Sequence, residues 1–383
     1  MKKIVILGST GSVGRQALQV VDEFPDKFKI IGLAAGSNIQ LLAKQVNKYQ
    51  PQYVSIGSKE DAALLQSLSK HKVEVFNGKE GLVNLAQIED IDLILIAVSG
   101  INGLLPTLTA LENKTTVALA NKETIVTAGS LVMEKAKKYG TTIIPVDSEH
   151  SALFQCLEKE NITAVEKLIL TASGGPFLNA TPDELSNVSP QMALSHPNWK
   201  MGAKITVDCA GLINKGLEII EAHWLFGMPY EKIEVVIHPE SIIHSLVQYK
   251  DGAVLAQLGC PDMRIPIQYA FTYPERFANS FPRLDFQELG KISFSKPDSV
   301  RFPGLWLAIE AGKIGGTMTT VFNGANEEAV RFFLKGCIKF IEIPQIIEKV
   351  MKQHQILADF QIEDILEIDQ WARLKAKEVI AGL

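Results

Sequence analysis

Short apolar runs alternate with amphipathic stretches through the first 150 residues of the chain. Within each amphipathic stretch the apolar residues recur at helical spacing, and the first such stretch, which includes Val13, is stopped by Pro25. This alternation predicts a doubly wound, mainly parallel sheet with helices on both faces. The predicted strands cover residues 4–7, 30–35, 53–56, 73–76, 93–98, 116–120 and 142–146.

The pattern changes beyond residue 149. Residues 167–271 contain fewer strands and longer polar connections, which favours an α+β domain whose loops hold a site. Residues 274–303 include four prolines and little periodicity, so we expect them to form a connection. The rest of the chain is helical in pattern, with helices predicted over 304–312, 318–335, 343–353 and 363–380.

The expected fold class is α/β, with an N-terminal Rossmann-like doubly wound sheet, a central α+β catalytic domain and a C-terminal helical domain. A chain of 383 residues allows two or three such domains. The expected boundaries are 1–149 for a cofactor-binding domain, 150–275 for a catalytic and connective domain, 276–303 for a linker and 304–383 for the helical domain.

Composition and charge narrow the classes of function. The formal net charge of −5 gives no general attraction to nucleic acid or to an anionic membrane. Only four apolar residues lie between Lys3 and Gly8, which is too short a run for a signal peptide. The four cysteines form no CxxC pair and are expected to be small, buried residues in a reducing compartment. We therefore expect a cytoplasmic protein.

A glycine-rich segment joins the first predicted strand to the first helix. Glycines at positions 8, 11 and 14 have the spacing GxxGxxG, a variant of the fingerprint that brings backbone close to a dinucleotide pyrophosphate. An ordinary strand-to-helix turn is the alternative. The second strand ends at Gly36-Ser37-Asn38 without a carboxylate, which favours NADP over NAD, although a plain turn has the same composition.

Carboxylates follow the last predicted strand of the sheet, at Asp147-Ser148-Glu149. In extended backbone, residues two apart face the same way, so both carboxylates could bind one divalent cation while Ser148 faces elsewhere. A helix N-cap followed by an acid in the first turn is an equally good interpretation.

A predicted helix places Asn214, Lys215 and Glu218 on one face, because these residues are three and four positions apart. A surface ion pair between Lys215 and Glu218 is the plain interpretation. Against it, the apolar residues along this helix indicate that the helix is largely buried, where lysine and glutamate need partners.

Three further segments have side chains suited to a phosphorylated ligand. Residues 171–177, which include Ser173, offer hydroxyls and closely spaced backbone amides that could bind a phosphate. A glycine turn without a function is the alternative interpretation. Lys122 follows a predicted strand and can polarise a carbonyl or simply begin a helix. Residues 196–202 could form a lid with Trp199 over a ligand, or Trp199 could be a core residue. His196, His238 and His244 lie in loop or strand-edge contexts, and no histidine pair has HxxxH spacing.

Taken together, these segments resemble the 1-deoxy-D-xylulose 5-phosphate reductoisomerase family along nearly the whole chain. Eight segments in order carry the resemblance: GSTGSVG at 8–14, LANKE at 119–123, PVDSEH at 145–150, TASGGPF at 171–177, HPNWKMG at 196–202, NKGLE at 214–218, IHPESIIHS at 237–245 and LGCPDMRIPI at 258–267.

The resemblance implies a homodimeric enzyme that uses NADPH and Mg²⁺ or Mn²⁺. Such an enzyme rearranges and reduces 1-deoxy-D-xylulose 5-phosphate to 2-C-methyl-D-erythritol 4-phosphate for isoprenoid precursor synthesis. The alternatives are an NADP-dependent, metal-requiring dehydrogenase of another phosphorylated polyol, and a catalytically silent NADP sensor.

The resemblance also implies residue roles. The implied metal ligands are Asp147, Glu149 and Glu218. The implied catalytic residues are Lys122, Glu149, Glu218, His196 and His244. The implied substrate contacts are Ser148, Glu149, Ser173, His196, Trp199, Cys209, Asn214, Lys215 and Glu218. The implied cofactor contacts are Gly8, Ser9, Thr10, Gly11, Ser12, Val13, Gly36, Ser37, Asn38, Asn121, Glu123 and Gly202.

Two positions depart from the family pattern. Cys209 stands where the family usually has a serine near the phosphate, and a thiol is the weaker hydrogen-bond donor. Ser37 stands where some relatives carry lysine, which bears on the strength of the NADP preference.

Overall fold

The computed structural model describes residues 1–195, 199 and 201–383. The chain forms two compact units. The first unit comprises residues 1–124, 132–151 and 262–282, and the second comprises residues 125–131, 152–261 and 283–383. The domain boundaries expected from the sequence stay a prediction.

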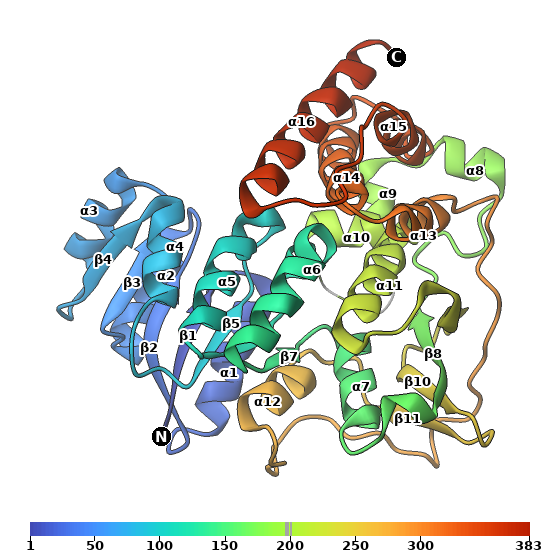
Figure 1. Ribbon diagram of the computed structural model, residues 1–383. Coiled ribbons are helices and arrows are strands. Elements are labelled where there is room, and N and C mark those ends of the chain that lie inside the picture. The colour runs from blue at the N-terminus through green and yellow to red at the C-terminus, as the bar shows by residue number, and fades with distance from the viewer. Residues whose placement is uncertain (196–198, 200) are drawn as a thin grey trace. The chain divides into compact units, whose positions relative to one another are not determined.

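Within the described residues, the first unit contains a seven-stranded sheet in the order β4-β3-β2-β1-β5-β6-β7, and every neighbouring pair is parallel (Figure 1). Each predicted apolar run forms one strand, with ends within two residues of those expected, which confirms the Rossmann-like sheet. The strands are β1 (Lys2–Leu7), β2 (Phe28–Ala34), β3 (Tyr53–Ile56), β4 (Glu74–Asn77), β5 (Leu93–Ile96), β6 (Thr116–Leu119) and β7 (Ile143–Pro145).

Helices connect these strands and cover the sheet. Helix α1 packs against α12 and helix α4 against α5. Helix α1 ends at Glu23, immediately before Phe24 and Pro25, as the position of that proline predicts. The helices are α1 (Ser12–Glu23), α2 (Ile39–Tyr49), α3 (Lys59–Leu68), α4 (Gly78–Ala86), α5 (Leu104–Glu112), α6 (Lys122–Tyr139), α7 (Ser148–Leu157) and α12 (Arg264–Thr272), of which residues 125–131 of α6 and 152–157 of α7 are counted in the second unit.

The described part of the second unit contains a four-stranded sheet in the order β11-β10-β8-β9. Strand β8 pairs in parallel with β9 and antiparallel with β10, so the sheet is mixed. Its strands are β8 (Val165–Ala172), β9 (Ile233–Ile237), β10 (Ile243–Tyr249) and β11 (Val254–Leu258). The mixed sheet agrees with the α+β architecture expected for the centre of the chain.

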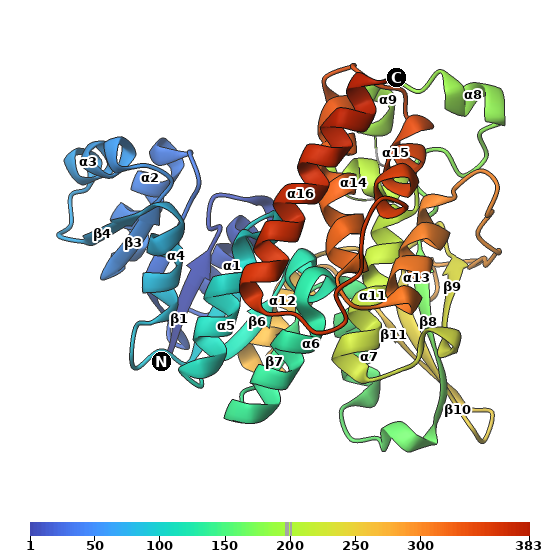
Figure 2. The ribbon, with the colours of Figure 1, turned by 45° about the horizontal axis from the view of Figure 1, so that its top comes forward.

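Helices make up the rest of the second unit, and Figure 2 shows α14 beside α15 and α16. The four helices predicted near the C-terminus are present, with ends within two residues of those expected. The helices of this unit are α8 (Pro182–Ser186), α9 (Pro190–Ala193), α10 (Ala203–Ala210), α11 (Ile213–Phe226), α13 (Gly304–Ile314), α14 (Met318–Leu334), α15 (Glu342–Met351) and α16 (Ile362–Ala381).

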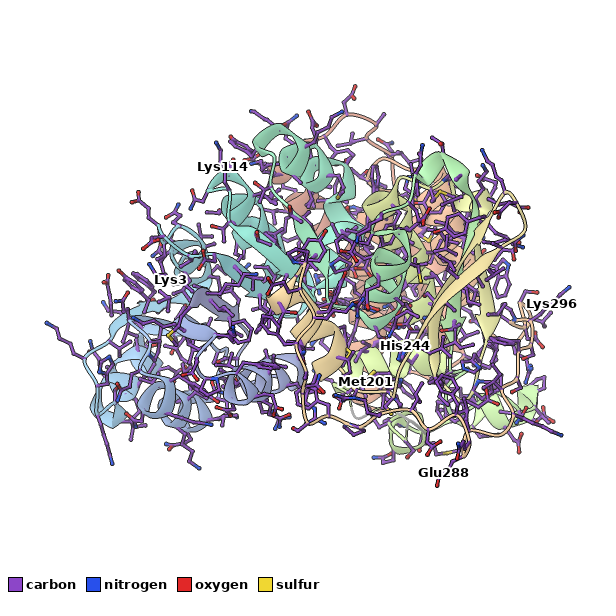
Figure 3. All side chains as sticks on the ribbon, turned by 90° about the horizontal axis from the view of Figure 1, so that it is seen from below. Lys3, Lys114, Met201, His244, Glu288 and Lys296 are labelled. Atoms are coloured by element: carbon purple, nitrogen blue, oxygen red, sulfur yellow. The ribbon has the colours of Figure 1, made fainter. Side chains whose placement is uncertain are left out.

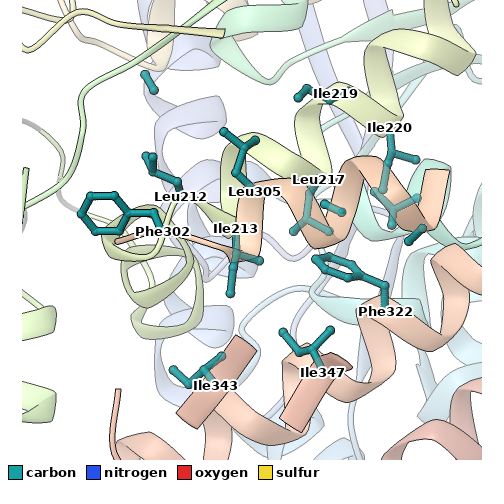
Figure 4. Packing of buried hydrophobic residues seen from close by; sticks show 14 of the residues in the cluster. Leu212, Ile213, Leu217, Ile219, Ile220, Phe302, Leu305, Phe322, Ile343 and Ile347 are labelled. Carbon is teal, nitrogen blue, oxygen red and sulfur yellow. The ribbon is translucent and has the colours of Figure 1, made fainter. Parts of the chain in front are cut away.

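The core of the second unit surrounds α11 (Figure 4). Leu217 and Ile220 on this helix are completely buried, as are Phe322 on α14 and Ile347 on α15. Burying a side chain of this size contributes about 1.5–3 kcal/mol each to folding. Helix α11 is therefore held firmly on several sides, which suits a helix that carries functional side chains near its N-terminus.

No helix in the described ranges combines the length and the apolar character needed to cross a membrane. All four cysteines are free thiols. The expectation that they are buried is wrong, because Cys337 is exposed and the other three are half-buried. Cys337 lies in the turn after α14, where the chain runs over the surface.

Candidate active site

The glycine-rich segment packs tightly between β1 and α1. A Cβ atom on Gly14 would lie 2.2 Å from the Gly8 carbonyl oxygen, so only glycine fits where the helix crosses the strand end. Gly11 precedes α1 and contributes no side-chain cap to it. The amides of the first helical turn therefore have no side-chain partner from Gly11, as a helix that receives a pyrophosphate requires.

The side chains of this segment point in different directions. Ser9 is buried, and its hydroxyl donates to Gln45 Oε1 on α2 at 2.7 Å, while Gln45 Nε2 donates to the Ser9 carbonyl at 2.9 Å. Ser9 thus fixes the loop through its side chain. Thr10, Ser12 and Val13 are half-buried and Gly11 is exposed, so they lie on the outer side of the loop.

The end of β2 leads into α2 through three exposed residues, Gly36, Ser37 and Asn38. Asn38 Oδ1 accepts a hydrogen bond from the Leu41 amide at 3.1 Å and so caps α2. The segment is a helix-capping turn, and it still offers no carboxylate that would repel a 2′-phosphate.

Asn121 connects two loops at the carboxyl ends of β5 and β6. Its Oδ1 caps α6 by accepting from the Thr124 amide at 3.0 Å. Its Nδ2 donates to the carbonyl oxygens of Val98 and Gly100 and to Glu123 Oε2, each at 2.9 Å. The Asn121 side chain therefore holds the loop after β5 in place, and the Glu123 carboxylate accepts a hydrogen bond from Asn121.

Lys122 and Asp147 follow neighbouring strands and form an ion pair. Lys122 Nζ lies 2.8 Å from Asp147 Oδ2, and the two side chains are 7% and 13% exposed. Burial opposes the charged form of Asp147, but the Lys122 ammonium and nearby His150 outweigh it and hold the pKa of Asp147 well below its ordinary value. Asp147 is therefore a carboxylate, the form that can bind a cation.

The backbone at 147–149 is not extended, so the argument that Asp147 and Glu149 face one way as residues of a strand is wrong. Helix α7 begins at Ser148, and Asp147 Oδ1 accepts from the Glu149 amide at 3.4 Å, as a helix cap does. Nor does Ser148 face elsewhere, because its hydroxyl donates to Glu149 Oε2 at 2.6 Å. The helix cap forms here in place of an extended segment because Asp147 satisfies a helix N–H that otherwise lacks a partner.

In the second unit, helix α11 brings together the trio expected from the sequence. Asn214 Nδ2 donates to Glu218 Oε1, and Lys215 Nζ donates to Glu218 Oε2. All three side chains are buried, at 7%, 3% and 1% exposure. The interpretation as a surface ion pair is therefore wrong, and the trio is a buried, hydrogen-bonded charge cluster.

The loop after β8 lies against the end of α10. A Cβ on Gly175, whose φ is +66°, would lie 2.9 Å from the Cys209 carbonyl oxygen. The Ser173 hydroxyl accepts from the Gly175 amide at 3.3 Å. The structure thus brings the loop of Ser173 and the half-buried Cys209 together within one unit, as a shared phosphate site requires.

His244 on β10 and Trp199 are also brought together, with ring centroids 6.4 Å apart. His244 is 8% exposed. It is labelled in Figure 3 together with Met201, which follows Trp199 by two residues. Gly202 is exposed and precedes α10. The prediction for His196 lies outside the described residues.

Two residues hold the site through contacts that the sequence did not predict. The Thr171 hydroxyl lies 2.7 Å from the Ile243 carbonyl oxygen and 2.8 Å from that of His244, so the two oxygens share its single hydrogen and the start of β10 is fixed. Asn326 on α14 donates to the buried Asp208 on α10 at 3.0 Å. Both contacts join segments far apart in the chain, so no local pattern marks them.

A parallel nucleotide-binding sheet with a tight glycine loop, together with buried carboxylates and lysines, defines a dinucleotide-dependent α/β enzyme. Comparison with known protein families identifies the family of enzymes to which the chain belongs. Residues 4–129 match the model of 1-deoxy-D-xylulose 5-phosphate reductoisomerase, and residues 143–226 and 258–375 match two models of its C-terminal domains. The chain belongs to the 1-deoxy-D-xylulose 5-phosphate reductoisomerase family.

Relatives and solved structures agree along the full length. The reductoisomerase of Pelotomaculum thermopropionicum is 51% identical, with 100% of both chains covered. That of Desulforamulus reducens is 52% identical, with 99% of both covered. The Zymomonas mobilis enzyme in complex with NADPH matches with a TM-score of 0.93 at 39% identity, covering 100% of both chains. A DOX-P reductoisomerase in complex with NADPH, fosmidomycin and magnesium matches at 0.95 and 38%, covering 100% of this chain and 98% of the other.

Proposed function

We propose that this protein converts 1-deoxy-D-xylulose 5-phosphate to 2-C-methyl-D-erythritol 4-phosphate, with NADPH as reductant and a divalent cation as cofactor. The observation that carries the proposal is the full-length match to named reductoisomerases at about half identical residues. The reaction is a step of isoprenoid precursor synthesis, and it makes the protein an NADP-dependent oxidoreductase.

The first unit suits NADPH. Its loop 8–14 has backbone packing that only glycine permits at Gly14, and it leads into the amides at the start of α1. We assign the pyrophosphate to Gly8, Ser9, Thr10, Gly11, Ser12 and Val13. Gly36, Ser37 and Asn38 are assigned to the 2′-phosphate end, where Ser37 can donate a hydrogen bond. Asn121, Glu123 and Gly202 complete the proposed cofactor contacts, and Ser9 and Asn121 contribute through the loops that they fix.

The carboxylates suit Mg²⁺ or Mn²⁺. Asp147 and Glu149 flank the start of α7, and Glu218 is a buried carboxylate on α11. Oxygen donors of this kind are those that hard divalent cations prefer. We assign all three as metal ligands. When bound, the cation supplies Lewis-acid polarisation of the substrate's carbonyl and hydroxyl oxygens.

The other polar residues bind and orient the short substrate. Asn214, Lys215, Ser173 and Cys209 are assigned to its phosphate, with Lys215 as the countercharge. Binding at the phosphate supplies affinity away from the reacting carbons and holds them in place. Asn214 and Lys215 both donate to Glu218, so two of the assigned phosphate contacts and one assigned metal ligand belong to one buried cluster.

Lys122 and Ser148 are assigned to the substrate's carbonyl and hydroxyl oxygens. The Lys122 ammonium is already fixed by Asp147, so it needs little reorganisation to donate. His196, Trp199 and His244 are assigned to the part of the site that closes over the substrate and excludes water. The contact between Trp199 and His244 supports this grouping.

We further infer that the enzyme is a homodimer that works in the cytoplasm. The dimer follows from the family resemblance. The compartment is supported by the four free thiols, because an oxidising compartment favours disulfides in chains with several cysteines.

The experiment that tests the proposal is an NADPH oxidation assay with the purified protein. We expect loss of NADPH absorbance only when 1-deoxy-D-xylulose 5-phosphate, NADPH and Mg²⁺ or Mn²⁺ are all present. Glu218→Gln should abolish this turnover, whereas Glu310→Gln on the exposed face of α13 should not. Turnover that survives chelation of the metal, or that survives Glu218→Gln, would refute the metal assignment.

A further inference from the structure

His238 is a completely buried histidine directly after β9, and both of its ring nitrogens have hydrogen-bond partners. Nε2 accepts hydrogen bonds from the backbone amides of Ile242 and Ile243, each at 3.2 Å. Nδ1 lies 3.0 Å from the Ser293 carbonyl oxygen and 2.9 Å from Glu240 Oε2.

These partners determine the protonation of the ring. A carbonyl and a carboxylate can only accept, so Nδ1 carries the hydrogen. Two backbone N–H groups can only donate, so Nε2 must be unprotonated. His238 is therefore a neutral imidazole with its hydrogen on Nδ1. Among titratable groups, the Glu240 carboxylate faces the ring, and Phe294 stacks on it with centroids 5.0 Å apart.

The backbone that His238 holds leads directly into His244. Ile243 begins β10, and its amide is the last one before that of His244. The carbonyl oxygens of Ile243 and His244 accept from the Thr171 hydroxyl. The start of β10 is thus fixed from one side by the imidazole of His238 and from the other by Thr171.

We propose that His238 is a positioning residue that fixes the backbone before His244 and thereby aims the His244 imidazole into the active site. This inference rests on the proposed function, in which His244 lies at the substrate. His238 itself is enclosed by Ile242, Ile243, Ser293 and Phe294 and acts through the strand. A side chain at this place must accept two backbone hydrogen bonds at once.

The Nε2 atom of His238 bonds to the backbone before His244, and the Nδ1 atom bonds to Ser293. Two substitutions can therefore test the two sets of bonds separately. In His238→Gln, the amide oxygen can reach the position of Nε2 and accept from the two amides before His244. In His238→Asn, the shorter amide can reach only the position of Nδ1 and keeps the bond to Ser293. If positioning of His244 is what matters, the glutamine variant works and the asparagine variant does not.

The first measurement is steady-state kinetics of the full-length enzyme with NADPH and Mg²⁺. When an active-site group is displaced by an ångström, the catalytic rate falls on the order of 10- to 100-fold. We therefore expect kcat/KM for 1-deoxy-D-xylulose 5-phosphate to fall by that factor in His238→Asn. The KM for NADPH should not change. His238→Gln should stay within about threefold of the wild type, as should the control His354→Asn, in the loop after α15.

A double-mutant cycle with His244→Gln separates positioning from general stability. Once the His244 imidazole is gone, adding His238→Asn should lower kcat/KM by less than about twofold further. The proposal is overturned if the asparagine variant is fully active, if the glutamine variant is equally impaired, or if His238→Asn costs the same factor in both backgrounds.

A spectroscopic readout tests the inference even if the wild type does not turn over this substrate, in which case the proposed function fails separately. In protein with ¹⁵N-labelled histidine, the His238 ring should show a protonated Nδ1 and an unprotonated Nε2. The His244 ring signals should shift in His238→Asn and stay in place in His238→Gln. His244 signals that do not move in His238→Asn would overturn the inference.

Discussion

Lys215 donates a hydrogen bond to Glu218 one turn further along α11, and both side chains are almost completely buried. The Asn214 amide donates to the other oxygen of Glu218, so an ammonium and an amide both stabilise this buried carboxylate. The pair therefore couples the stability of the helix to the integrity of the proposed site.

This coupling predicts a specific pattern of stability. In the presence of a metal chelator, Lys215→Met should lower the free energy of unfolding by about 3 kcal/mol, since the buried Glu218 carboxylate loses the ammonium with which it is paired. The double variant Lys215→Met/Glu218→Gln should recover most of that loss. Urea denaturation measures the free energy of unfolding of both variants. The exposed pair Lys352–Glu348 is the control, and Lys352→Met should cause no measurable change. A double variant as unstable as Lys215→Met would show that charge compensation is not the cause.

The glycine loop gives a second prediction. Gly14→Ala places a methyl group 2.2 Å from the Gly8 carbonyl oxygen, so the helix must move away from the loop. We expect a loss of about 1–3 kcal/mol in stability and at least a tenfold weaker NADPH affinity, measured by fluorescence titration. Gly36→Ala is the stability control, because no atom lies within 4 Å of its Cβ position. NADPH affinity unchanged in Gly14→Ala would mean that the loop is not the pyrophosphate site.

Cys209 provides a prediction about substrate affinity. It lies beside the loop of Ser173, and a hydroxyl donates a stronger hydrogen bond than a thiol. Cys209→Ser should therefore lower the KM for 1-deoxy-D-xylulose 5-phosphate severalfold, which corresponds to about 1 kcal/mol. Cys337→Ser, at an exposed position, should leave KM unchanged. If affinity is the same in Cys209→Ser, residue 209 does not contact the phosphate.

The reactivity of the thiols should differ with pH. Burial raises the pKa of Cys156 to about 11, so at pH 8 only about one thiol in a thousand is the reactive thiolate. Iodoacetamide at pH 8 should modify exposed Cys337 and leave Cys156 intact, as peptide mass spectrometry can show. Because the pKa is raised, the rate at Cys156 should increase about tenfold per pH unit up to that pKa. Equal rates at the two cysteines at pH 8 would contradict the burial argument.

The sheet could be predicted from the sequence because parallel strands covered on both faces are nearly continuous apolar runs. Strand β5, for example, is completely buried from Leu93 to Ile96. The trio on α11 could be predicted because helical spacing alone puts Asn214, Lys215 and Glu218 on one face.

Other parts of the site depend on contacts that no local pattern reveals. Lys122 meets Asp147 because β6 pairs with β7, with Leu119 opposite Pro145, so the residues after the two strands come side by side. At Asp147 the sequence fits both an extended segment and a helix cap, and the cap prevails because it satisfies a helix amide. The two acceptor bonds of His238 arise from a turn that folds back on the ring, which no spacing encodes.

A reductoisomerase both rearranges and reduces its substrate, so the carbon skeleton of the product tests the proposed function most directly. The protein is incubated with 1-deoxy-D-xylulose 5-phosphate, NADPH and Mg²⁺, and the product is identified by carbon NMR. We predict the branched skeleton of 2-C-methyl-D-erythritol 4-phosphate. An unbranched 1-deoxypentitol phosphate would show a simple dehydrogenase of a phosphorylated polyol and would contradict the account.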